Sequence, residues 1–211
     1  MSEKDAPVRG TLSAGLSFGA VSFIGTTSVG LFTSIFIARL YGVKVVGQFA
    51  LVYAPVLAAW LLSTVREQPA LQREVAVLAP RDPRVTGLFA AVFTFSTALT
   101  VAVSAIAAIV SYFVFHGPIK HPGLVAPTLA SLLGYTVFTN TCMNFDSIFI
   151  GFRDGRELLW LRLHQALAYL VLIVAARLFS ASVWSLVVAT AFSWFFPCIH
   201  RLVTVRKWMR L

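Results

Sequence analysis

Long apolar runs separated by short polar segments dominate the chain. Asp, Glu, Lys and Arg are absent from five windows, residues 10–38, 45–65, 85–119, 121–145 and 178–200. A helix needs about 17–25 mostly apolar residues to cross a bilayer, and all five windows are long enough. A shorter window, 163–176, reaches this length when it is extended to Leu158–Ser180, which places Arg162 and Arg177 near its two ends.

This pattern predicts an all-α integral membrane protein with six transmembrane helices. We expect the helices at about 12–37, 45–65, 86–113, 125–150, 158–180 and 181–202. Together they form one transmembrane domain, residues 12–202, between a polar tail at 1–11 and a basic tail at 203–211.

The amino-acid composition also indicates that the chain lies in a membrane. The chain is 58% hydrophobic and 12% charged, whereas soluble domains are about 45–50% apolar and about 25% charged. A 211-residue soluble fold could not cover so much apolar surface. We therefore expect lipid to surround most of the chain.

The positive charge is unevenly distributed between alternate loops. Of 17 lysines and arginines, 13 fall on one side of the predicted bundle, in the N-terminal tail, the 66–84 loop, the 152–162 segment and the C-terminal region from Arg201. Arg39, Lys44, Lys120 and Arg177 fall on the other side. Cytoplasmic loops are the richer ones in lysine and arginine, so both termini are predicted to be cytoplasmic. The net charge of +9 then indicates anionic membrane lipid as the partner, and no nucleic acid.

Two segments between the predicted helices and two rows of small residues within them have recognisable sequence patterns. Residues 38–44 predict a tight turn around Gly42, and Pro69–Leu78 could form a short interfacial helix. Small residues recur every three or four positions in two helices, which either packs the helices closely or lines a polar path. The rows are Gly15, Gly19, Ser22, Thr26 and Gly30, and Thr97, Thr100, Ser104, Ala108 and Ser111.

Asp146 is the one carboxylate predicted to lie inside the membrane. Intramembrane carboxylates are costly and usually face a partner or a wet cavity. We hypothesise that Asp146 hydrogen-bonds His164 or Gln165, beside a cavity lined by Asn140 and Asn144. The alternative is that Asp146 lies near the interface and reaches the headgroups.

Several residues admit a simple structural interpretation. Arg39 is either an anchor at the external face or a contact for an anionic substrate, and Arg66 is either a boundary charge or a contact for an anionic headgroup. Cys142 and Cys198 are expected to be buried as small apolar side chains. No nucleotide loop, metal-binding signature or nucleophile motif occurs in the sequence. We therefore predict no enzyme activity, no catalytic residue, no metal and no cofactor.

The segment LSFGAVSFIGTTSVGLFTSIFIARLYGVKVVGQFALVYAP resembles the start of bacterial polysaccharide (O-antigen type) flippases of the multidrug/oligosaccharidyl-lipid/polysaccharide exporter superfamily. The matching positions are Ala38, Arg39, Tyr41, Gly42, Gly47, Phe49 and Ala50. The segment from Phe145 to Trp194 is similar to the family's helices four to six. The resemblance is a diffuse pattern of glycines, arginines and helix lengths.

The resemblance implies a transporter of the bacterial inner membrane that flips lipid-linked oligosaccharide precursors of polysaccharide or lipopolysaccharide by alternating access. Its substrate would be a polyprenyl-diphosphate-linked glycan, with Arg39, Arg66 and Arg177 near the diphosphate and Asn140 and Asn144 near sugar hydroxyls. The family has two six-helix lobes, so this chain is expected to be an N-terminal half or to pair with a second copy. The alternative function is a membrane subunit that supports a polysaccharide biosynthesis complex without transporting anything itself.

Overall fold

The computed structural model describes residues 12–64 and 67–209, and every regular element in these ranges is helical. The predicted tail at 1–11, Arg66 and the last two residues lie outside the described residues. The elements are α1 (Leu12–Ser63), α2 (Glu67–Val77), α3 (Pro83–His116), α4 (Val125–Gly134), α5 (Asn140–Gly151), α6 (Gly155–Phe179) and α7 (Val183–Val205). A 3₁₀ turn, Pro122–Leu124, precedes α4, and a π-helical turn, Tyr135–Thr139, joins α4 to α5.

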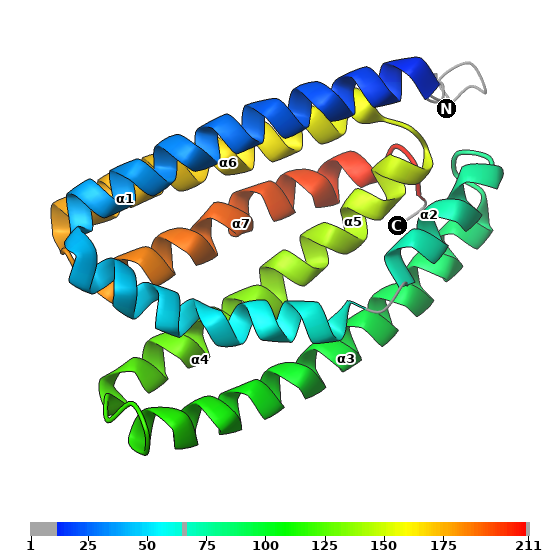
Figure 1. Ribbon diagram of the computed structural model, residues 1–211. Helices are drawn as coiled ribbons and strands as arrows, with labels where there is room; N and C mark the ends of the chain where they lie inside the picture. The colour runs from blue at the N-terminus through cyan, green and yellow to red at the C-terminus, as the bar shows by residue number, and fades with distance from the viewer. Residues whose placement is uncertain (1–11, 65–66, 210–211) are drawn as a thin grey trace.

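Helix α1 is bent at a single residue, Gly42. Its φ of 76° and ψ of 162° belong to a region that essentially only glycine adopts. The two arms diverge from the elbow toward the right of Figure 1, with α7 between them. The expected break of seven residues, 38–44, is therefore wrong in extent, because the helix continues to both sides of the elbow.

Two side chains hold this elbow against α6. The Tyr41 hydroxyl donates to the carbonyl of Ile173 at 2.8 Å, and the Arg177 Nε donates to the carbonyl of Leu40 at 2.7 Å. The bend at Gly42 takes the Leu40 carbonyl out of the regular helical hydrogen-bond pattern. Arg177 thus satisfies a backbone group that the bend leaves open.

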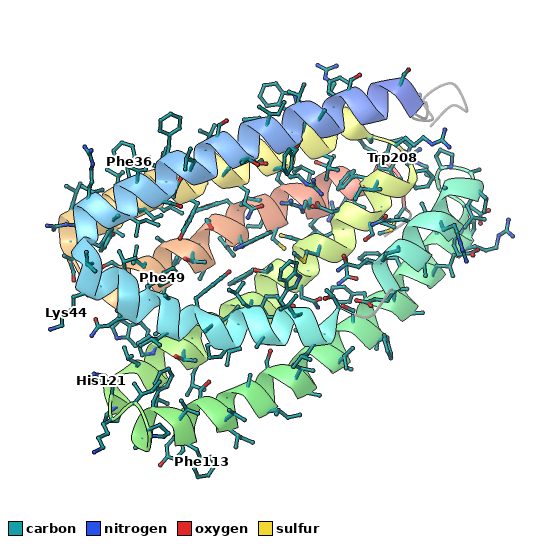
Figure 2. The ribbon with its side chains drawn as sticks, in the orientation of Figure 1. Phe36, Lys44, Phe49, Phe113, His121 and Trp208 are labelled. Carbon is teal, nitrogen blue, oxygen red and sulfur yellow. The ribbon has the colours of Figure 1, made fainter. Side chains whose placement is uncertain are left out.

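The bundle has two distinct ends. The elbow of α1, the α3–α4 connection and the α6–α7 link lie at the left in Figure 1, whereas α2, the α5–α6 turn and the C-terminal segment lie at the right. Figure 2 places Lys44 and His121 at the first end, here called the elbow end, and Trp208 at the other, here called the α2 end. The loops rich in lysine and arginine and the loops poor in them therefore lie at opposite ends of the bundle.

The π-helical turn divides the helix that was predicted at 125–150. The backbone N–H of Asn140 donates to the carbonyl of Tyr135, five residues earlier. Such turns add one residue to an otherwise regular helix, so α4 and α5 still form one apolar run. The run begins at Pro122 and ends at Gly151.

Helix α2 confirms the short helix expected near Pro69–Leu78. Its buried residues, Leu71 and Val75, pack into the core cluster at the α2 end together with Phe149 and Phe152. A Cβ on Gly151 would lie 2.8 Å from the Val75 Cγ1, so a glycine is needed for this close approach.

Asp82 is the N-cap residue of α3. Hydrogen bonds from Arg84 lower the pKa of its carboxyl group.

Within the described ranges, five helical runs are long and apolar enough to cross a membrane, with α1 counted as one. Large apolar side chains cover their outer surfaces. Phe113 is 67% exposed and Phe179 is 91% exposed, and Phe36 and Phe113 point away from the bundle in Figure 2. A surface of this kind is stable in lipid and not in water, which indicates a multi-pass membrane protein.

Replacing Gly42 by alanine is expected to lower the free energy of unfolding in detergent micelles by about 1–3 kcal/mol, because the elbow requires a glycine-only backbone conformation. Gly47→Ala is the matched control: both positions have open space for a Cβ, but only Gly42 has a positive φ. We expect Gly47→Ala to be neutral or slightly stabilising. Equal stability of the two variants would contradict the elbow assignment.

Candidate functional site

A cavity of about 820 Å³ lies between the two arms of α1 and the inner faces of α5, α6 and α7, with α2 at one end. We call it the central cavity. Its lining residues are Thr26, Phe49, Tyr53, Trp60, Thr64, Glu67, Gln68, Pro69, Gln72, Met143, Asp146, Ser147, Ile150, Arg162, Gln165, Ala166, Tyr169, Thr190, Ser193 and Trp194. Among the lining residues that the structure describes, only Thr26 comes from the first arm of α1, so the second arm and α5–α7 form most of the wall.

The wall combines aromatic rings with hydrogen-bonding groups. Five aromatic side chains contribute apolar faces, and glutamine, serine and threonine side chains lie between them. Pockets of this volume and composition are typical of sites for small organic ligands. The site can therefore accept a ligand that carries both apolar faces and polar substituents.

The charged part of the cavity is built around Asp146. Arg201 on α7 donates from Nε to the Asp146 Oδ1 at 2.6 Å and from Nη2 to Oδ2 at 3.3 Å. The Arg201 side chain is fully buried, whereas that of Asp146 keeps 13% of its surface exposed. A buried arginine requires a carboxylate partner because removal of either charge would leave the other uncompensated. The bidentate pair thus joins α5 to α7.

A second arginine lies on the other side of the same carboxylate. The Arg162 Nε is 3.8 Å from the Asp146 Oδ2, and the Arg162 side chain is 42% exposed on the cavity wall. Because Arg201 is closer and already neutralises Asp146, this three-residue group has a net positive charge. Of the two arginines, Arg162 is the one that lines the cavity and can contact a ligand there.

The structure corrects the expected partners of Asp146. They are two arginines, not His164 or Gln165. Gln165 does line the same cavity. His164 is exposed and its ring lies between those of Trp160 and His200, at centroid distances of 5.8 and 5.9 Å. Asp146 therefore has side-chain partners beside a cavity, as hypothesised, but the partners are different residues.

Sequence reasoning missed Arg201 because the last helix was expected to end at residue 202. Helix α7 extends to Val205, which places Arg201 one turn inside the helix instead of at its boundary. The mainly apolar sequence continues past Arg201, and this continuation is the signal that could have placed the residue inside the helix. An intramembrane arginine is the natural partner of an intramembrane aspartate.

Asn140 and Asn144 do not line the central cavity. The Ser96 hydroxyl on α3 donates to the Asn140 Oδ1 at 2.8 Å, and the Asn144 Nδ2 donates to the Ser96 Oγ at 3.2 Å. The Asn140 Nδ2 also donates to the Thr97 Oγ1 at 3.4 Å. These amides join α5 to α3, as polar residues between membrane helices commonly do. Their expected place at the cavity is corrected.

Two predicted arginines lie at the elbow end, away from the cavity. Arg39 is exposed on the first arm of α1. Arg177 is engaged with the Leu40 carbonyl. Neither contributes to the cavity wall, and Arg66 lies outside the described residues. Of the eight predicted site residues, the structure brings Asp146 and Gln165 together in the cavity.

Comparison of the chain with models of protein families, with curated proteins and with solved structures gave no match. The site is therefore interpreted from its own geometry.

Replacing Arg201 by glutamine is expected to lower the free energy of unfolding by about 3–5 kcal/mol, because the Asp146 carboxylate loses its closest cation. The double variant Asp146→Asn/Arg201→Gln should lose clearly less than the two single variants added together. Arg162→Gln, which removes a more exposed charge at 3.8 Å, should change stability by about 1 kcal/mol or less. Additive effects in the double variant would show that the two charges do not interact.

Proposed function

We propose that this protein is a six-span lobe of a transporter in the bacterial inner membrane, with both termini in the cytoplasm. The bend at Gly42 supports six crossings, because each arm of α1 is long enough to cross once. The separation of the basic loops supports the orientation: the α2 end carries α2, the α5–α6 turn and the C-terminal segment, which hold most of the basic loop residues.

We further propose that the lobe flips a lipid-linked oligosaccharide across the membrane by alternating access. The observation that carries this proposal is the central cavity, which places aromatic rings, amide groups and an accessible arginine inside a bundle whose outer surface is apolar. A membrane protein that only packs against partners has no need of such an interior. The sequence resemblance to polysaccharide flippases supports the same substrate class.

The chemistry of each cavity residue indicates which part of the substrate it would contact. Tyr53, Tyr169 and Trp194 would stack on sugar rings, and Gln165 would hydrogen-bond sugar hydroxyls. Arg162 would contact the diphosphate, because a guanidinium binds phosphate oxygens with two parallel hydrogen bonds. The polyprenyl chain would stay in the bilayer while the polar part crosses inside.

The complete transporter would contain a second lobe. It is either another copy of this chain or a second six-helix unit, and it would cover the side of the cavity on which the first arm of α1 supplies only Thr26. Rocking of the two lobes would then expose the cavity to each side of the membrane in turn.

Filling the cavity tests the transport proposal. Ala166→Trp places a large ring in the cavity, and Ala102→Trp places the same ring at an exposed position of α3. In a deletion strain that expresses either variant at equal membrane levels, we expect Ala166→Trp to abolish surface polysaccharide and to accumulate lipid-linked intermediate. Ala102→Trp should restore both to the parental level. Normal surface polysaccharide with Ala166→Trp would favour the supporting-subunit alternative.

The proposed contact between Arg162 and the diphosphate is tested by comparing Arg162, inside the cavity, with Arg39, outside it. Arg162→Gln should reduce the rate of export by about 10-fold to 100-fold, the range expected for loss of a hydrogen bond to a charged group. Arg39→Gln makes the same chemical change at the elbow end, outside the cavity, and should leave export unchanged. The measurement is the rate at which labelled sugar appears on the cell surface. Equal rates for the two variants would exclude Arg162 as the phosphate contact.

A further inference from the structure

Cys142 on α5 and Cys198 on α7 face the same seam between these two helices. They lie far apart in the sequence, but the Cys142 Sγ donates to the carbonyl of Trp194, which is one helical turn before Cys198, at 3.7 Å. Cys142 is buried, whereas Cys198 is half-buried. The sequence indicated only two unrelated small side chains.

The thiol pair lies beside the Asp146–Arg201 ion pair. Asp146 is one turn after Cys142 on α5, and Arg201 is one turn after Cys198 on α7, so the two contacts are neighbours along the same seam. An arginine next to a thiol favours the thiolate, which is the reactive form of cysteine.

Arg201 also has a donor that no other contact uses. Its Nη1 is buried and has no hydrogen-bond partner in the described part of the chain. A buried, unsatisfied donor on a charged group is rare in proteins and usually has a functional or structural reason. A thiolate on the same seam is a suitable acceptor for this nitrogen.

We propose that Cys142 and Cys198 are a reversible dithiol–disulfide pair that links α5 to α7. In the forward step Cys198 first loses its proton, and its thiolate is then oxidised together with the Cys142 thiol: one S–S bond forms, the Cys142 proton is released, and two electrons pass to an acceptor that takes up two protons. The acceptor is a small disulfide, which is reduced to two thiols, or a diazene, which is reduced to a hydrazine. A disulfide requires two Cα atoms about 4.4–6.8 Å apart, and the contact of the Cys142 Sγ with the α7 backbone shows that the two helices pack closely at this turn.

The link changes the cavity because both helices line it. Met143, Asp146 and Ser147 lie on α5, and Ser193 and Trp194 lie on α7. A covalent bond between Cys142 and Cys198 prevents these two walls from separating. If α5 and α7 move apart during alternating access, oxidation arrests the lobe; this consequence rests on the proposed function, whereas the formation of the bond does not.

Thiol counting and mass spectrometry test the bond itself. The purified full chain in detergent micelles is treated with diamide, denatured, and reacted with a maleimide that adds a fixed mass to each free thiol. We expect two labelled thiols before oxidation, none after oxidation, a mass decrease of two hydrogens, and full recovery with dithiothreitol. A proteolytic fragment that joins the α5 and α7 peptides identifies the pair. The same result should be obtained with copper–phenanthroline, an oxidant that enters apolar regions.

Single variants supply the controls. Cys142→Ser and Cys198→Ser each retain one thiol and should form no intramolecular link under the same conditions. Two free thiols in the oxidised wild-type chain, or adducts and crosslinked dimers in place of the internal link, would overturn the proposal.

A second measurement separates this proposal from the transport proposal. In vesicles that contain the protein, oxidation should slow movement of a lipid-linked oligosaccharide at least 10-fold, dithiothreitol should restore it, and Cys142→Ser/Cys198→Ser should not respond to oxidant. A disulfide that forms without slowing transport would refute the arrest. Absence of transport by the reduced protein would refute transport by paired copies of this chain and leave the thiol result standing.

Discussion

Polar groups buried in this bundle away from the cavity have no water to bond, so most of them bond a group in their own helix or on a neighbouring one. The bonds that follow from this constraint also determine the arrangement of the helices. Asp146 is held by Arg201 across α5 and α7, the amides of Asn140 and Asn144 bond α3, and Tyr41 ties the elbow of α1 to α6. Apolar contacts cannot specify these pairings, because lipid tails are as apolar as the helix surfaces. Hydrogen bonds therefore supply much of the specificity of the fold.

The helices could be predicted from the sequence because hydrocarbon imposes a simple rule of length and charge. The ranges expected for the last five helices agree with the structure apart from their ends. The elbow was harder to predict, since a turn of several residues and a bend at one glycine leave the same pattern of Gly42 between Arg39 and Lys44. The π-helical turn has no signature in the sequence. A shift of one residue in hydrogen bonding depends on how α4 and α5 pack against their neighbours.

The site was predicted only in part, because its members come from elements far apart in the chain. Asp146 could be identified as a buried charge in an apolar run, and Gln165 as a neighbour at similar depth. The partner of Asp146 depends on which helices adjoin α5, and a list of spans does not contain that information. Arg162 and Arg201 look alike in the sequence as boundary charges. Their surroundings distinguish them: one is fully buried and the other faces the cavity.

The π-helical turn, Tyr135–Thr139, sets the rotation of α5 and with it the direction of two different surfaces. Residues that follow it present amides to α3 on one side and Asp146 to α7 and the cavity on the other. One residue corresponds to about 100° of rotation in a regular helix. A chain with one residue fewer in this turn would rotate the carboxylate away from α7 and the amides away from α3. The extra residue thus sets the rotation of α5 so that one of its faces meets α3 and another meets α7.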